Sequence, residues 1–87
     1  MTRVEIYTKA FCPYCWRAKS LLESKGVRFK EISVDFGGED KVRMVQRAGG
    51  RTTVPQIFIG EVHIGGCDDL LALERAGKLD TLIDIRQ

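Results

Sequence analysis

The sequence has no long apolar run and is poor in proline and histidine, with two prolines and one histidine among 87 residues. No stretch approaches the roughly 18 consecutive apolar residues of a transmembrane helix, which argues against a membrane-spanning protein. Neither sign of charge dominates, because 14 basic residues face 12 acidic ones and the two signs are interspersed. This balance argues against a dedicated nucleic-acid surface but leaves room for a local basic patch that binds a small anion.

A secretion signal is also missing from the first residues. The segment from Met1 to Ile6 alternates apolar and charged residues, without the apolar stretch and cleavage site of a signal peptide. We therefore expect a cytoplasmic protein, in a compartment where thiols stay reduced and structural disulfides are rare. The cysteines number three, and two of them form a Cys-x-x-Cys pair, which in such a compartment points to redox chemistry or metal binding.

The length and composition indicate one ordinary folded domain. A chain of 87 residues with 44% apolar and 30% charged residues is typical of a small globular protein. A domain of this size has little room for a large internal cofactor pocket. We expect residues 1–87 to form a single domain that is monomeric and holds no bound cofactor.

The N-terminal part of the chain combines a strand with a helix that starts at a cysteine. Alternating apolar residues predict a strand over Arg3–Tyr7. Pro13 suits the first turn of a helix, since its missing N–H would have no partner there, and this makes Cys12 the predicted N-cap. Cys15 and later apolar residues fall on one face of this helix, which we expect to end near Lys25.

The middle of the chain adds a second strand and a second helix. Residues 27–34 predict a strand whose alternation slips near Glu31, and we interpret the slip as a bulge or a strand end. The following loop contains glycine. Val42, Val45 and Ala48 then form the apolar stripe of a helix that stops at two glycines.

A hairpin and a helix complete the pattern. Ile57–Ile59 and Val62–Ile64 are short strands separated by a two-residue turn that begins with glycine, which predicts an antiparallel hairpin. Asp68 and Asp69 open a third helix, where negative charge is favourable. Apolar residues near the C-terminus indicate one last helical turn.

This order of elements is that of an α/β fold. Strand, helix, strand, helix, strand, strand and helix predict a four-stranded mixed sheet with helices on both faces. The first two strands should be parallel and joined by a right-handed crossover. The expected architecture is a thioredoxin-like fold at nearly its minimum length.

The cysteine pair lies where a strand has ended and a helix begins. The backbone N–H groups there have no intrahelical partner and form the positive end of the helix dipole, so they favour a thiolate on Cys12. Cysteines in such positions are largely ionised at neutral pH. We therefore predict Cys12 as the attacking nucleophile. Cys15, one turn inside the helix on its apolar side, should keep its proton and later resolve a mixed disulfide on Cys12.

Two other interpretations of the cysteines stay open. The pair can simply pack as small apolar side chains. A zinc site with three sulfurs and one nitrogen is the second, with ligands Cys12, Cys15, His63 and Cys67. One observation argues against the zinc site. Because side chains alternate along a strand, His63 should point away from its apolar neighbours, and we expect a surface imidazole.

Three motifs, taken in order, resemble the glutaredoxin family over essentially the whole chain. They are Cys12-Pro13-Tyr14-Cys15, Thr53-Val54-Pro55 and Gly65-Gly66-Cys67-Asp68-Asp69. The resemblance implies a glutathione-dependent thiol–disulfide oxidoreductase, with glutathione as reducing cosubstrate and with glutathionylated or disulfide-containing proteins as partners. Classical thioredoxins differ, since they carry Gly-Pro between the cysteines.

The resemblance also implies roles for residues around the cysteines. Pro55 should be cis and face the nucleophile, leaving the backbone of Val54 to pair with the cysteinyl backbone of glutathione. The N–H groups of Cys67 and Asp68 should hold the γ-glutamyl carboxylate at a helix N-terminus, while the Asp68 side chain meets the ammonium group. Asp68 is alternatively, or additionally, a simple helix cap.

Further residues complete the expected glutathione site. Lys9 resembles the basic residue of the family near the glycyl carboxylate and the thiolate, and Thr53 belongs to the peptide-binding segment. Tyr14 either packs on the bound peptide or covers the helix start. Cys67 is expected to be a buried small residue, with an oxidisable thiol as the alternative. Candidates for a basic rim are Arg43, Arg47 and Arg51.

The family suggests one rival function. Some glutaredoxins hold an iron–sulfur cluster between two protomers through the first cysteine and glutathione. Those that resemble the Cys-Pro-Tyr-Cys motif here usually do so poorly, since the proline restricts the loop. The alternative function is a metal or iron–sulfur carrier that uses either Cys12 with glutathione or the four side chains of Cys12, Cys15, His63 and Cys67.

Overall fold

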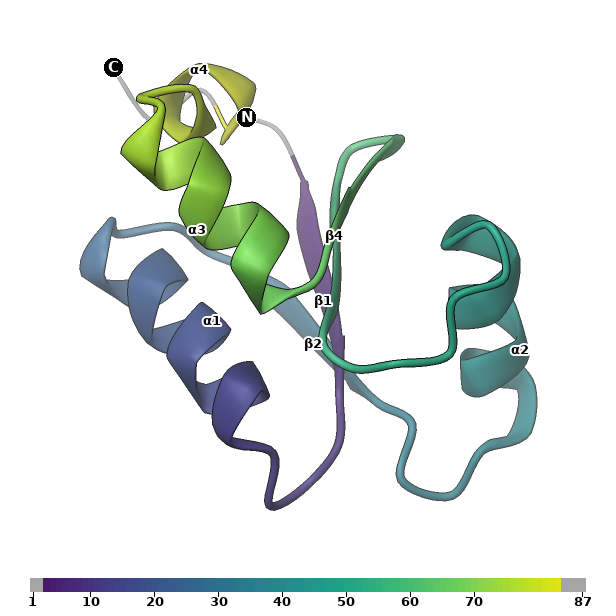
Figure 1. Cartoon of the computed structure of the whole chain (residues 1–87). Helices are drawn as coiled ribbons and strands as arrows, with labels where there is room; N and C mark the ends of the chain where they lie inside the picture. Colours follow the sequence, from purple (N-terminus) through teal and green to yellow (C-terminus); the bar gives the residue numbers. More distant parts are fainter. Residues whose placement is uncertain (1–2, 84–87) are drawn as a thin grey trace.

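The computed structural model describes residues 3–83 of the chain. These residues form a four-stranded sheet with helices on both faces (Figure 1). The strands are β1 (Val4–Thr8), β2 (Lys30–Ser33), β3 (Gln56–Ile59) and β4 (Val62–Gly65). The helices are α1 (Pro13–Ser24), α2 (Gly38–Arg47), α3 (Cys67–Arg75) and α4 (Leu79–Ile83).

The sheet is mixed, with the strand order β2-β1-β3-β4. β1 pairs with β2 in parallel, across the crossover made by α1, and with β3 in antiparallel orientation. β3 and β4 form an antiparallel hairpin that turns at Gly60. The predicted thioredoxin-like α/β fold with a four-stranded mixed sheet is therefore confirmed.

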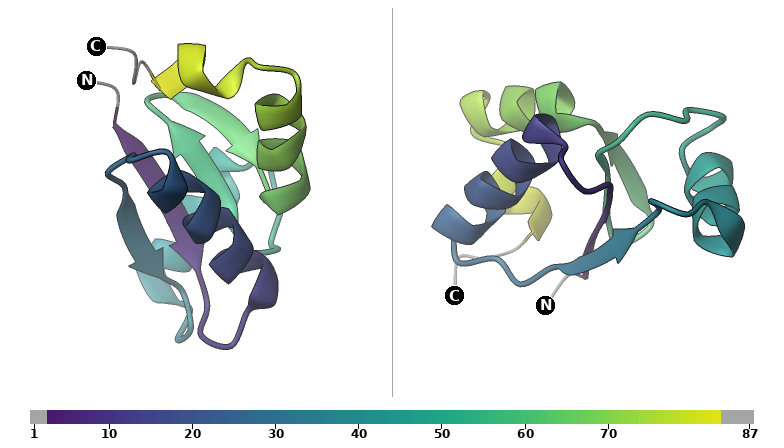
Figure 2. Two further views of the ribbon diagram at one scale, coloured as in Figure 1. Left: turned by 90° about the vertical axis from the view of Figure 1, so that its left-hand side faces the viewer. Right: turned by 90° about the horizontal axis from the view of Figure 1, so that it is seen from below.

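Two apolar layers cover the two faces of the sheet, and Figure 2 shows α2 on the face opposite α1 and α3. The alternation of β1 explains this arrangement, because Ile6 points to the α1 side while Tyr7 points to the α2 side, and both are buried. The core under α1 and α3 includes Leu22, Ile57, Leu70 and Leu79. The smaller core under α2 contains Tyr7, Val34, Met44, Ala48 and Phe58. The central strands are thus held from both sides.

The second strand is shorter than the sequence predicted. β2 begins at Lys30, so residues 27–29 lie outside it. The N–H of Val27 donates instead to the Leu22 carbonyl at 3.0 Å, which closes the end of α1 around the left-handed residue Gly26. The slip in alternation therefore marks the start of the strand, not a bulge.

Among residues 3–83, no helix is both long and apolar enough to cross a membrane.

Candidate active site

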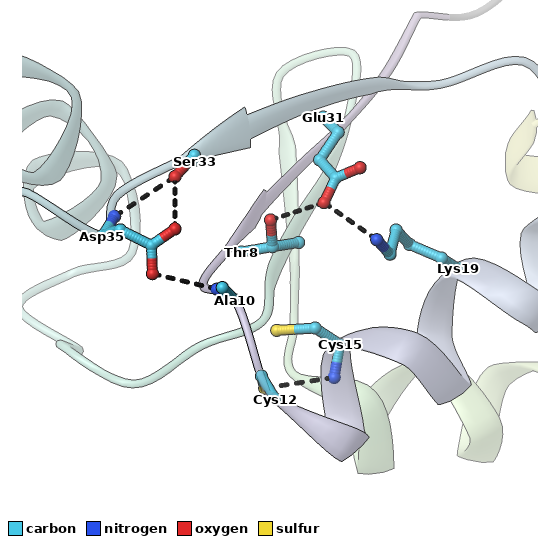
Figure 3. A network of polar contacts seen from close by, with 8 residues as sticks. All are labelled: Thr8, Ala10, Cys12, Cys15, Lys19, Glu31, Ser33 and Asp35. Atoms are coloured by element: carbon cyan, nitrogen blue, oxygen red, sulfur yellow. Dashed lines mark hydrogen bonds and ion pairs between the residues drawn. The ribbon is translucent and has the colours of Figure 1, made fainter.

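Cys12 stands at the N-terminus of α1, directly after the loop that leaves β1. It is the N-cap residue, in extended conformation with φ of −114°, and Pro13 follows it as the first helical residue. Its Sγ accepts a hydrogen bond from the backbone N–H of Cys15 at 3.2 Å (Figure 3). The predicted N-cap is thus confirmed, and the sulfur lies where a negative charge is stabilised by backbone N–H and the helix dipole.

A carboxylate from the neighbouring loop holds the segment before Cys12 in place. Asp35, just after β2, accepts a hydrogen bond from the Ala10 N–H at 2.9 Å and another from the Ser33 hydroxyl at 2.8 Å (Figure 3). The Ala10 bond, followed by the Ser33 bond, lowers the pKa of the Asp35 carboxyl. Phe11, between this held segment and Cys12, has a left-handed conformation with φ of 56° and is 90% exposed. Our sequence reasoning did not single out Asp35.

Cys15 is fully buried beneath the helix start, as its place on the apolar face of α1 predicted. Burial, with a smaller effect from the neighbouring Cys12, raises the pKa of the Cys15 thiol to about 12. Such a thiol keeps its proton at neutral pH and is shielded from reagents in solution. The two cysteines therefore lie in different environments although they are three residues apart.

A polar cluster attaches the cysteine helix to the sheet beside Cys15. The buried hydroxyl of Thr8 donates to Glu31 Oε2 at 2.7 Å, and Lys19 Nζ donates to the same oxygen at 2.9 Å (Figure 3). These bonds, that of Thr8 first, lower the pKa of the Glu31 carboxyl. Lys19 lies one helical turn beyond Cys15. The cluster thus links α1 to the strand β2, and the sequence analysis missed it.

An open hollow of about 320 Å³ lies at the same end of the sheet and combines three parts of the chain. It is lined by Tyr14 of α1, by Arg51, Thr53, Val54 and Pro55 before β3, and by Gly66, Cys67, Asp68 and Asp69 at the start of α3. The Val54–Pro55 peptide bond is cis, as expected. All of the expected glutathione-site residues except Lys9 therefore line one hollow. Lys9 lies on the loop before Cys12 and is not among the lining residues.

The start of α3 differs in detail from the sequence prediction. The N-cap is Gly66, and Asp69 supplies the cap, since its Oδ2 accepts the Gly66 N–H at 2.9 Å. The prediction that Asp68 caps the helix is therefore wrong, because the helix begins at Cys67 and Asp69 occupies the third helical position. A Cβ at Gly65, whose φ is 116°, would collide with the Asp69 carboxylate. The N–H groups of Cys67 and Asp68 belong to the first turn and have no intrahelical acceptor.

Only one of the three candidate arginines reaches the hollow. Arg51 lines it and lies 3.4 Å from Asp69 Oδ2. Arg47 pairs with Glu5 at 2.9 Å and stacks over the Phe58 ring, 4.1 Å from its centroid. Arg43 lines a different hollow, on the β1–β2 side of the sheet.

Cys67 belongs to the core under α1 and α3, and the residue is 3% exposed. Burial raises the pKa of its thiol, so an ionised Cys67 is disfavoured. This placement agrees with the expected buried small residue.

His63 is not the surface imidazole that the alternation predicted. Its ring stacks on Phe58 with 4.9 Å between centroids, and its Nε2 lies 2.7 Å from Gln56 Oε1. Phe58 belongs to the α2 face, whereas Cys67 belongs to the opposite face. Two of the predicted zinc ligands, His63 and Cys67, thus lie on opposite sides of the sheet. Within the described part of the chain, no group of three or more His, Cys, Asp or Glu residues is arranged to hold a metal ion.

A Cys-x-x-Cys pair at a strand–helix junction of a thioredoxin-like fold, with one half-buried and one buried cysteine, defines a thiol–disulfide oxidoreductase. Comparisons with known proteins agree. A sequence profile described as "Glutaredoxin" matches residues 4–64. The curated glutaredoxin of Pseudomonas aeruginosa is 61% identical over 83 residues, which cover 95% of this chain and 98% of the relative. The chain belongs to the glutaredoxin family.

Solved structures support the same assignment. The solution structure of the glutaredoxin from Brucella melitensis is 54% identical, with a TM-score of 0.84, over 100% of this chain and 94% of that chain. A crystal structure of a buckwheat glutaredoxin–glutathione complex is 34% identical, with a TM-score of 0.84, over 95% of this chain and 77% of that chain.

Proposed function

We propose that the chain, residues 1–87, acts as a single-domain, glutathione-dependent thiol–disulfide oxidoreductase that reduces protein–glutathione mixed disulfides and protein disulfides. One observation carries the proposal. Cys12 caps α1 two residues before Tyr14, which lines a hollow together with the segment before β3 and the start of α3. The glutathione complex of the buckwheat relative supports the choice of ligand.

The hollow offers two kinds of backbone contact to glutathione. Val54 precedes β3, so its N–H and C=O lie outside the ladder of the sheet and can pair with the cysteinyl backbone of the tripeptide. The N–H groups of Cys67 and Asp68 can receive the γ-glutamyl carboxylate at the positive end of α3. The Asp68 side chain, at the same edge, is suited to the ammonium group.

Side chains at the rim add charge and cover. We propose that Arg51 and Lys9 bind the glycyl carboxylate of glutathione as cations. We propose that Tyr14 packs over the bound peptide. Arg51 has the stronger structural support, because it lines the hollow whereas Lys9 does not.

The chemistry divides between the two sulfurs. The Cys12 thiolate attacks the glutathionyl sulfur of a mixed disulfide, forms a Cys12–glutathione disulfide and releases the protein thiolate, which takes a proton from water. A second glutathione thiolate attacks the bound glutathionyl sulfur, which yields glutathione disulfide and restores Cys12. With a protein disulfide, the Cys12 thiolate first forms a Cys12–protein disulfide and releases one protein thiolate. Cys15 then loses its proton to water and attacks the Cys12 sulfur, which forms the Cys12–Cys15 bond and releases the second protein thiolate. Two glutathiones reduce this bond back to two thiols and leave as glutathione disulfide.

We place this activity in the cytoplasm and assign it to a monomer.

The test compares Cys12→Ser with Cys15→Ser. Reduction of a purified glutathionylated peptide by glutathione is followed by the release of glutathione disulfide. We expect Cys12→Ser to lose this activity, and Cys15→Ser to retain it while losing turnover with a protein disulfide. A Cys12→Ser variant with undiminished deglutathionylation would refute the proposal.

A further inference from the structure

Gln56, the first residue of β3, has a fully buried polar side chain. Its Nε2 donates to the Thr53 carbonyl at 3.0 Å and lies 3.2 Å from the Thr53 hydroxyl oxygen. Its Oε1 lies 2.7 Å from Nε2 of His63. A buried amide is costly unless its groups are paired, so this arrangement of three partners is specific.

The chemistry of these groups gives the chain of hydrogen bonds a direction. The Thr53 carbonyl can only accept, so the NH₂ group of Gln56 must face it. The Gln56 oxygen therefore faces His63, and His63 must carry a proton on Nε2. Donation runs from His63 to Gln56 and from Gln56 to Thr53.

The surroundings of His63 keep it neutral. It pairs across the hairpin with Phe58 and stacks on that ring. Burial is the main cause that lowers the pKa of the imidazole. The positive charge of Arg51, on the loop before β3, lowers it further, as does that of Arg47 on α2, while Asp69 on α3 acts in the opposite direction. A neutral imidazole has a single N–H, and here that group donates to Gln56 Oε1.

Neither Gln56 nor His63 lines the hollow, whereas Thr53 does. We propose that His63 and Gln56 are positioning residues, which act through Thr53 to hold the peptide-binding segment before β3 in its binding orientation. The ligand class is the tripeptide backbone of glutathione, so this inference rests on the proposed function. The hydrogen bonds from His63 through Gln56 to Thr53 begin on the opposite face of the sheet from Cys67.

Two variants of His63 separate hydrogen-bond donation from packing. His63→Phe keeps an aromatic ring against Phe58 but removes the donor, which leaves the buried Gln56 oxygen without its partner. His63→Gln keeps an N–H donor at this position. Loss of one neutral hydrogen bond corresponds to a factor of about 2 to 10 in an equilibrium constant.

The assay is steady-state reduction of a glutathionylated peptide by glutathione. We expect His63→Phe to raise KM for the peptide about 2- to 10-fold with kcat within about twofold of wild type, and His63→Gln to restore most of the loss. The rate of Cys12 alkylation by iodoacetamide, measured on the same folded proteins, should not change. An unchanged KM in folded His63→Phe, an equal defect in His63→Gln, or an altered alkylation rate would each overturn the proposal.

A second measurement does not depend on activity. Long-range ¹H–¹⁵N spectra of the wild-type imidazole should show the neutral tautomer with the proton on Nε2 at pH 7. A proton on Nδ1 would overturn the proposed direction of the hydrogen bonds. Failure of the wild-type protein to reduce the glutathionylated peptide would refute the proposed function instead, and the tautomer would still test the hydrogen-bond chain.

Discussion

The contrast between the two active-site sulfurs predicts how the folded protein reacts with an alkylating reagent. At pH 8, a thiol with a pKa of about 12, the value for buried Cys15, is ionised in about one molecule in ten thousand. A free cysteine with a pKa of ~8.5 is ionised in about one molecule in four at this pH. The thiolate fraction of Cys15 is thus about 2,500-fold smaller than that of a free cysteine, and its reaction with iodoacetamide should be slower in consequence, before any further protection by its full burial.

The assay is intact-mass spectrometry of the reduced protein during alkylation at pH 8, with peptide mapping of the label. Wild type should take one label rapidly, on Cys12, and Cys12→Ser should take none on the same time scale. Cys67 stays unlabelled as well, since burial also raises the pKa of its thiol. All thiols should react once the chain is unfolded in guanidinium. Rapid labelling of Cys15 in folded Cys12→Ser would refute the reasoning.

Three further predictions concern stability. Because the pKa of the Asp35 carboxyl is lowered, its contribution to folding stability is complete above the pKa of the unfolded chain and is lost as the pH falls through the pKa of the folded protein. Asp35→Asn should therefore lose less stability than wild type between pH 7 and pH 3 in urea titrations. Equal losses would contradict a stabilising role for the Asp35 hydrogen bonds to Ala10 and Ser33. Gly65→Ala should destabilise the protein by about 1–3 kcal/mol, because its φ is left-handed and its Cβ would displace Asp69; thermal unfolding measures this, and an unchanged Tm would argue against the cap. The lowered pKa of His63 means that the unfolded chain binds a proton before the folded one, so the free energy of unfolding should fall as the pH drops below 6.5. His63→Phe should show a smaller loss of stability between pH 7 and pH 5, and an identical pH profile would contradict a neutral, half-buried imidazole.

Local sequence signals predicted the start of the cysteine helix correctly. The signals are the proline after Cys12 and the helical spacing of the apolar residues that follow. Both act between residues close in sequence, which is enough to decide where a helix begins and which face it buries. The hairpin of β3 and β4 was predictable for the same reason, because two alternating segments flank a short turn.

The prediction failed for His63 because alternation states only to which side of a strand a residue points. Whether that side meets water depends on what packs there. Here Phe58 and the buried Gln56 occupy the neighbouring positions on β3, and Arg47 of α2 extends over the Phe58 ring. The side chain that looked solvent-facing therefore joins a packed layer.

The sequence by itself determined the cysteine motif, the order of helices and strands and the resemblance to glutaredoxins, since these depend on neighbouring residues. Only the tertiary structure decided how the site is supported. Asp35 reaches the amide of Ala10 across 25 positions of the chain, and Glu31 accepts from Thr8 across 23. Such pairs carry no local signal, because they form only after the strands β1 and β2 lie side by side and bring their ends together.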